Sequence, residues 1–126
     1  MTRIKVCGIT DERDALEAVH LGVDAVGFVL SKTSPRFIAP REAGRIGSRL
    51  PPFVARVGVF ADEPPAQVAD AIYAAGLTAL QFQGSETPGY CRRFPLAWYK
   101  SFALGPGFDP ERLSEYSCTL ANRLRA

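Results

Sequence analysis

Short apolar runs alternate along the chain with longer stretches in which apolar residues recur every three or four positions. Compact runs bounded by Gly or Pro are typical of buried strands, and the longer spacing is typical of helices. The runs predict five strands, near residues 3–8, 25–30, 55–61, 78–83 and 97–104. A helical stretch follows each run, so the pattern predicts five βα units of about 25 residues each.

Start and stop signals support the predicted helices. Thr10 is a candidate N-cap for the first helix, and Gly22 can end it in the left-handed conformation. Pro40 is a favourable first residue for a second helix, which extends to Leu50. The other three are predicted after Pro64–Pro65, at residues 86–94 and from residue 110 to 116. Because Leu113, Tyr116, Leu120 and Leu124 continue the helical spacing, residues 117–125 are expected to prolong the fifth helix instead of forming a sixth strand.

Alternating strands and helices predict a parallel α/β architecture, and two folds are built in this way. One is an open flavodoxin-like sheet with reordered strands, and the other is a closed (β/α)8 barrel, or TIM barrel, with strands in sequential order. A complete barrel needs at least about 200 residues. Residues 1–126 are therefore expected to form a single domain, which in the second case is a truncated barrel of about five βα units.

Composition and charge exclude several classes of protein. The chain is 47% hydrophobic and 22% charged, which is too apolar for intrinsic disorder. Its net charge is +2 without a basic cluster, so we expect no nucleic-acid partner. The apolar run at residues 25–30 is far shorter than the roughly 20 residues that span a bilayer, so we expect no membrane segment. The basic start is followed by no long apolar stretch, which argues against a secretory signal.

The cysteines and the single histidine narrow the chemistry. Cys7, Cys91 and Cys118 form an odd, widely spaced set, which is typical of reduced thiols and predicts a cytoplasmic protein. His20 is the only histidine, and it falls late in the first predicted helix, where a surface position is expected. A metal site built from several histidines is therefore excluded.

Side chains alternate across a strand, so the two faces of each predicted strand can be told apart. Helices cover the outside of a barrel, which directs Lys5 and Cys7 into the interior, with Cys7 near the carboxyl end where barrel active sites lie. The same alternation directs Gln81 and Gln83 into the interior from the fourth strand. Polar side chains are thus predicted to converge at one end of the sheet.

Two of the candidate residues have both a structural and a functional interpretation. Cys7 is either a small buried hydrophobe or an acid–base thiolate with Lys5 as its cationic neighbour. Arg36, which follows Ser34–Pro35 in the loop after the second strand, is either a solvated arginine or a planar donor to a substrate carboxylate. Residue type and position alone favour the structural interpretation for each.

Two weaker signals concern Asp62 and the glycine-rich segment at residues 105–107. Asp62 follows the third strand and could accept a phosphoryl group in a receiver-like sheet, but the first strand ends in Cys7–Gly8 instead of a carboxylate pair. Gly105–Pro106–Gly107 lacks the longer pattern of a phosphate-binding loop, so a plain turn is expected there.

Six short segments, taken in order and spacing, resemble phosphoribosylanthranilate isomerase over about 116 residues, which is more specific than any single motif. They are Lys5-Val6-Cys7-Gly8-Ile9-Thr10, Gly27-Phe28-Val29, Ser34-Pro35-Arg36, Leu50-Pro51-Pro52-Phe53, Val57-Gly58-Val59-Phe60 and Gln81-Phe82-Gln83-Gly84.

The resemblance implies a (β/α)8 barrel enzyme of tryptophan biosynthesis that uses no cofactor. Such an enzyme converts N-(5-phosphoribosyl)anthranilate to 1-(2-carboxyphenylamino)-1-deoxyribulose 5-phosphate by an Amadori rearrangement. An acid protonates the ribose ring oxygen and opens the ring to an iminium, and a cysteine base then removes the C2′ proton. By resemblance Cys7 is that base, Arg36 binds the anthranilate carboxylate, and Gln81 and Gln83 contact the substrate.

The sequence departs from the family pattern in two ways. Gln83 stands where the family usually has histidine. Family members also continue into a sixth strand that carries the acidic Asp, and later into glycine-rich loops that bind the phosphate. Residues 117–126 here contain no carboxylate.

We therefore expect five of the eight units of this isomerase, with the base but without the acid and the phosphate site, and inactive alone. The alternative is a flavodoxin-like or half-barrel module that acts only by association. In either case, unpaired sheet edges predict self-association.

Overall fold

The computed structural model describes residues 1–117 and contains a five-stranded, fully parallel sheet in the order β1-β2-β3-β4-β5. The strands are β1 (Lys5–Cys7), β2 (Ala25–Val29), β3 (Ala55–Phe60), β4 (Ala79–Phe82) and β5 (Ala97–Lys100). The helices are α1 (Glu12–His20), α2 (Pro40–Gly47), α3 (Pro65–Ala74), α4 (Pro88–Cys91), the 3-10 turn η1 (Pro110–Arg112) and α5 (Leu113–Tyr116).

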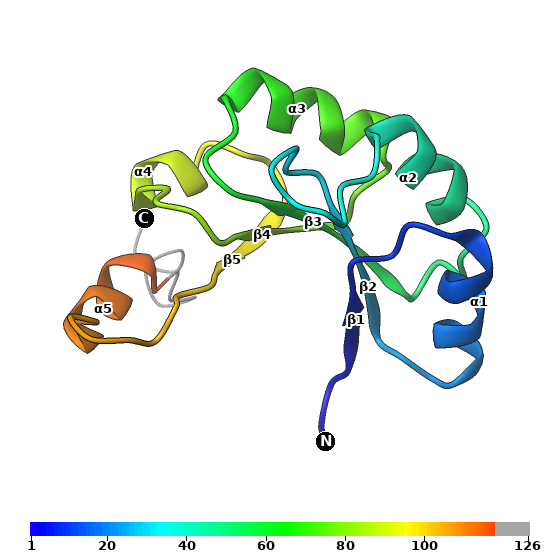
Figure 1. Ribbon diagram of the computed structural model, residues 1–126, viewed down its shortest axis with the longest axis horizontal. Helices are drawn as coiled ribbons and strands as arrows, with labels where there is room; N and C mark the ends of the chain where they lie inside the picture. Colours follow the sequence, from blue (N-terminus) through cyan, green and yellow to red (C-terminus); the bar gives the residue numbers. More distant parts are fainter. Residues whose placement is uncertain (118–126) are drawn as a thin grey trace.

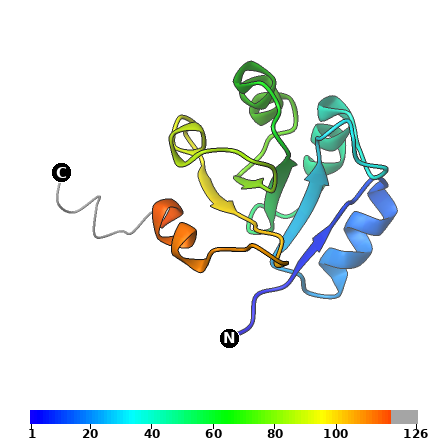
Figure 2. The same cartoon turned by 60° about the vertical axis from the view of Figure 1, so that its left-hand side comes forward.

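The strand order distinguishes the two predicted folds. Each strand pairs with its sequence neighbours, and within residues 1–117 β1 is an edge strand that pairs with β2 alone. A flavodoxin-like sheet would put the first strand between two others, so that alternative is wrong. The helices lie along the outer arc of the curved sheet, as Figures 1 and 2 show. This is the arrangement of five consecutive units of a (β/α)8 barrel, as predicted.

The apolar core lies between the sheet and these helices. Val26, Phe28, Leu80 and Phe82 have fully buried side chains and belong to one hydrophobic cluster. Their positions alternate along β2 and β4, which confirms the predicted side-chain directions. The other face of β4 carries Gln81, and the other face of β2 carries the small residues Ala25 and Gly27.

The helix boundaries differ from the prediction at several ends. Asp11, not Thr10, caps α1, because its carboxylate accepts from the Arg13 and Asp14 amides. Gly22 has φ +87° and ends this unit as predicted. The second helix ends at Gly47, with Ser48 as its C-cap, and not at Leu50; Pro51 disfavours helical geometry at Leu50, the residue before it.

The later elements are shorter than predicted. Thr87 caps α4 through the Tyr90 amide, so this helix begins at Pro88 and spans only four residues. The last strand ends at Lys100, where its pairing with β4 stops. Ser117 has extended geometry (φ −63°, ψ 101°), so the fifth helix ends at Tyr116 and is not prolonged there. The rest of the predicted extension, residues 118–125, lies outside the described residues.

Candidate functional site

Lys5, Cys7 and Gln81 meet on the interior face of the sheet. The Lys5 ammonium lies 3.5 Å from the Cys7 sulfur and also donates to Gln81 Oε1. Two strands separate β1 from β4, so this contact spans the concave side of the curved sheet. The structure therefore confirms the predicted inward direction of all three side chains.

Gln81 is held by three hydrogen bonds. Its Oε1 accepts from the Tyr99 hydroxyl at 2.9 Å as well as from Lys5, and its Nε2 donates to Ser101 Oγ at 2.9 Å. Tyr99 and Ser101 both come from β5 and the residue that follows it. The amide is thus part of an interior network that joins β1, β4 and β5.

Arg36 lies at the carboxyl end of β1, beside Cys7. Its guanidinium Nη1 donates to the Cys7 carbonyl at 3.2 Å, and its backbone amide donates to Ser34 Oγ. Gly8 has φ +85°, and a Cβ there would stand 2.6 Å from Nη1. The bare glycine therefore allows Arg36 to cross the end of the strand while its side chain stays exposed.

Cys7 also depends on a glycine beside it. It pairs in register with Gly27 of β2, and a Cβ on Gly27 would come 2.7 Å from the Cys7 sulfur. The sulfur thus occupies the space that a side chain on β2 would fill. Cys7 is half-buried, with an ammonium at its sulfur and a guanidinium at its carbonyl.

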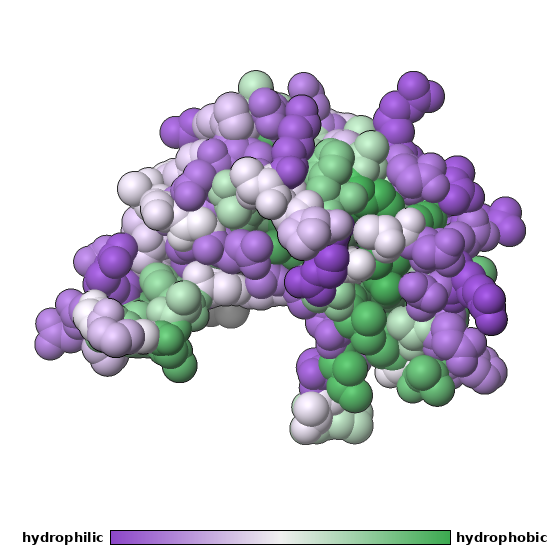
Figure 3. Space-filling view, viewed as in Figure 1, coloured by the Kyte–Doolittle hydropathy of each residue, from purple (hydrophilic) through white to green (hydrophobic). Residues whose placement is uncertain are grey.

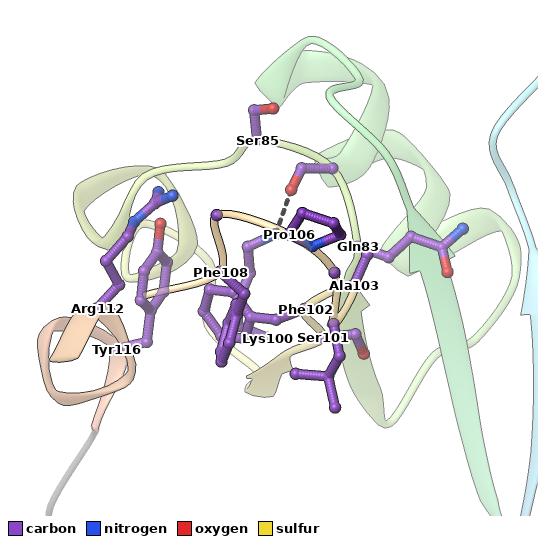
Figure 4. A pocket seen from close by; sticks show the side chains of 14 residues that line it. Gln83, Ser85, Lys100, Ser101, Phe102, Ala103, Pro106, Phe108, Arg112 and Tyr116 are labelled. Carbon is purple, nitrogen blue, oxygen red and sulfur yellow. Dashed lines mark hydrogen bonds between the residues drawn. The ribbon is translucent and has the colours of Figure 1, made fainter. Parts of the chain in front are cut away.

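Gln83 is exposed and lies apart from this cluster. It lines a hollow of about 550 Å³ beyond β4 and β5, together with the segment 100–108. Figure 4 shows its amide pointing away from the other labelled side chains of that pocket. Within residues 1–117 its side chain makes no hydrogen bond to Cys7, Arg36 or Gln81.

Asp62 has a structural task. Its backbone is left-handed (φ 65°), its carboxylate accepts from the Ser85 amide at 2.8 Å, and its own amide donates to Glu86 Oε1. Receiver-like sheets have the reordered strands that are excluded above. The phosphoacceptor interpretation of Asp62 is therefore wrong, and its contacts hold the loop between β4 and α4.

A buried ion pair beneath that loop was not predicted. Glu86 and Lys100 approach to 3.0 Å, and their side chains are 1% and 4% exposed. Lys100 also donates to the Gly84 carbonyl, a contact drawn in Figure 4. A lysine that ends an apolar strand, on the face toward the helices, is the signal that could have revealed the pair.

The remaining sequence expectations concern His20, the cysteines, metals and membranes. His20 is in the last turn of α1, as expected. Cys7 and Cys91 are free; burial, with Glu86 adding to it, raises the pKa of the Cys91 thiol to about 11.

The part of the chain that the structure describes has no group of three or more His, Cys, Asp or Glu side chains suited to a metal. Nor does any helix within residues 1–117 have the length and apolar character needed to cross a membrane.

Comparison with known proteins identifies the family. The family model of N-(5'phosphoribosyl)anthranilate (PRA) isomerase matches residues 4–120. The N-(5'-phosphoribosyl)anthranilate isomerase of Nitrosospira multiformis is 52% identical over 107 residues, which cover 85% of this chain and 51% of that protein. The enzyme of the same name from Nitrosomonas eutropha is 50% identical over the same coverage. The chain thus spans about half the length of the curated relatives it matches.

Solved structures agree with the sequence relatives. Phosphoribosyl anthranilate isomerase from Thermus thermophilus superposes with a TM-score of 0.82 at 45% identity, covering 87% of this chain and 56% of that one. A phosphoribosyl anthranilate isomerase in complex with reduced 1-(o-carboxyphenylamino)-1-deoxyribulose 5-phosphate gives 0.77 at 45% identity, covering 79% and 53%. Because the family model matches residues 4–120 of this chain, the chain belongs to the phosphoribosylanthranilate isomerase family.

Proposed function

We propose that residues 1–126 supply the amino-terminal part of a phosphoribosylanthranilate isomerase active site, for the Amadori rearrangement of tryptophan biosynthesis. The observation that carries the proposal is the meeting of Cys7 and Arg36 at the carboxyl end of β1, 3.2 Å apart between the guanidinium and the Cys7 carbonyl. Barrel active sites lie at that end of the sheet. A proton-accepting sulfur and a planar carboxylate binder are therefore neighbours there.

Cys7 acts as the base in this proposal. After the ribose ring has opened to the iminium, the thiolate takes the C2′ proton, and the C–H electron pair forms the enolamine that becomes the ketone. The Lys5 ammonium lies 3.5 Å from this sulfur. Arg36 binds the anthranilate carboxylate through guanidinium N–H groups other than the one that donates to the Cys7 carbonyl.

The two glutamines differ in what supports them. Gln83 has an exposed amide at the carboxyl end of β4, and the proposal gives it a polar contact with the substrate where relatives use histidine. The substrate contact predicted for Gln81 stays a prediction, because its amide already bonds to Lys5, Tyr99 and Ser101. These bonds support a different role, argued below.

The acid and the phosphate site belong to the other half of the barrel in this proposal. Losing a positioned acid costs about 10² to 10⁴ in rate. Losing the phosphate anchor removes remote binding energy that positions the sugar. Residues 1–126 alone are thus expected to be inactive, and the alternative of a non-catalytic half-barrel module differs only in whether a complementary half restores turnover.

Self-association of residues 1–126 is part of the same proposal. Each edge strand, β1 and β5, pairs with one neighbour within the described residues. Apolar side chains are exposed near both edges, with Ile4 54% and Leu104 81% accessible. Figure 3 shows hydrophobic surface along β1 and beside α5. Unpaired edges next to apolar surface favour association with another chain.

The free thiols of Cys7 and Cys91 support a cytoplasmic setting.

Arg36→Met tests the carboxylate site. The assay uses residues 1–126 mixed with the carboxyl-terminal half of the Nitrosospira multiformis relative, here called the reconstituted barrel. We expect KM to rise at least about tenfold with a smaller change in kcat, because a charge-assisted hydrogen bond is worth about 1.5–3 kcal/mol. Turnover is followed by the loss of anthranilate fluorescence. Arg41→Met, on the exposed side of α2, is the matched control and should leave KM unchanged. An unchanged KM in Arg36→Met would remove Arg36 from the site.

A further inference from the structure

We propose that Gln81 and Tyr99 are positioning residues that hold the Lys5 ammonium beside the Cys7 sulfur and thereby raise the reactivity of this thiol. The inference concerns the reactivity of Cys7 toward electrophiles. Its importance for turnover rests on the proposed function, but the reactivity itself does not. It also gives Gln81 a role without a substrate contact.

Further contacts hold the Lys5 ammonium beside the Cys7 sulfur. Its four-carbon stem is flexible, and a single 3.5 Å contact to sulfur is weak. Gln81 Oε1 supplies a second acceptor for the ammonium from the opposite side of the concave face. The Tyr99 ring, 5.7 Å from Lys5 Nζ, adds a cation–π contact.

The orientation of the Gln81 amide is fixed by its partners. Lys5 can only donate, so it must face the amide oxygen, and the Tyr99 hydroxyl donates to the same atom. The amide nitrogen faces Ser101 Oγ at 2.9 Å. A flipped amide would turn its donor toward the ammonium and lose the bond to Lys5, whereas the Tyr99 and Ser101 hydroxyls can each donate or accept. β4 and β5 therefore present a preset acceptor to a residue of β1.

The choice of a neutral acceptor keeps the positive charge available. Within residues 1–117 Lys5 forms no ion pair with a carboxylate, since the described salt bridges involve Arg3, Arg45, Arg49 and Lys100. An amide can hold an ammonium without cancelling its charge, whereas a glutamate in its place would cancel it. The uncompensated ammonium therefore places a positive charge beside the sulfur, where it attracts an anionic electrophile.

Alkylation of Cys7 measures this effect without any turnover. In the reaction the thiolate displaces iodide from iodoacetamide or iodoacetate, so an S–C bond forms as the C–I bond breaks. Rates are measured on residues 1–126 at neutral pH and low salt by mass spectrometry of the tryptic peptide that contains Cys7, which is Val6–Arg13 in the wild type and residues 4–13 in Lys5→Met. Cys91 falls in a separate peptide and serves as an unreactive reference, because burial raises the pKa of its thiol to about 11.

Comparing the anionic iodoacetate with the neutral iodoacetamide separates the effect of the Lys5 charge from a general structural change, which would affect both reagents alike. Lys5→Met should slow both reagents and lower the iodoacetate-to-iodoacetamide rate ratio at least about threefold, because the anion loses an attractive charge near the sulfur. Lys5→Arg should largely preserve the ratio. Gln81→Met should lower it in the same direction as Lys5→Met, since the ammonium is then free to leave the sulfur.

Gln81→Glu tests the charge of the acceptor, and Tyr99→Phe tests the hydroxyl that donates to it. Gln81→Glu retains the oxygen acceptor, yet its added charge should lower the ratio as well. Tyr99→Phe removes only one donor and should give a smaller fall. Gln67→Met, the same substitution on the exposed side of α3, is the control and should change nothing. Circular dichroism establishes that each variant is folded.

Two results would overturn the proposal. An unchanged ratio in Lys5→Met would mean that the ammonium does not act on Cys7. A wild-type ratio in folded Gln81→Met and Tyr99→Phe, with a reduced ratio in Lys5→Met, would mean that Lys5 needs no positioning. Neither result depends on whether the chain takes part in isomerisation, so the proposed function can fail or stand separately.

Discussion

Cys7→Ser in the reconstituted barrel is expected to lower kcat at least about a hundredfold, because a hydroxyl is a far poorer proton acceptor than a thiolate. Substrate binding should change little, since the carboxylate site at Arg36 stays intact and serine is close in size to cysteine. The Lys5 ammonium and the small neighbour Gly27 accommodate either side chain. The expected pattern is therefore a loss in kcat with KM nearly preserved.

The matched control is Cys91→Ala. Cys91 is fully buried in α4, away from the interior face, and its thiol is not used in the proposed chemistry. This variant should keep the wild-type kcat when the barrel is assembled. Turnover near the wild-type value in Cys7→Ser would return Cys7 to a packing role and leave the reaction without its base.

Lys100→Met is expected to destabilise residues 1–126 by about 3–5 kcal/mol, because it leaves Glu86 buried with an uncompensated charge. The Glu86 side chain is 1% exposed and loses a partner at 3.0 Å. The Gly84 carbonyl loses its donor at the same time. The remaining bond from the Asp62 amide cannot neutralise the carboxylate.

Urea unfolding followed by circular dichroism measures the effect at several protein concentrations. Glu86→Gln combined with Lys100→Met should cost clearly less than Lys100→Met alone, since no charge is then left in the core. Equal losses in the two variants would mean that the packing of the lysine stem, and not the ion pair, stabilises this loop.

The periodic parts of the fold could be predicted from the sequence. Alternation along the strands was enough to direct Lys5, Cys7 and Gln81 to one face, and the βα repeat was enough for a parallel sheet. Helix ends were less certain, because Thr10 and Asp11 are both good caps and only the backbone geometry selects Asp11.

Contacts between distant segments could not be predicted in this way. Strand alternation gives the face of a side chain but not its partner, so the bond from Lys5 to Gln81, 76 residues apart, needed the curvature of the sheet. The Glu86–Lys100 pair depends on the register of β4 against β5 and on the loop that Asp62 holds. Arg36 reaches the Cys7 carbonyl because Gly8 has no Cβ, which would stand 2.6 Å from Nη1.

The most direct test of the central claim compares residues 1–126 alone with the reconstituted barrel. Light scattering measures size, and loss of substrate fluorescence measures conversion of N-(5-phosphoribosyl)anthranilate. The account predicts a self-associated chain without turnover, and turnover once the carboxyl-terminal half is added to wild-type chain but not to Cys7→Ser. A monomer that turns over substrate by itself would contradict the account, and Asp62 would then be the first residue to mutate in a search for a substitute acid.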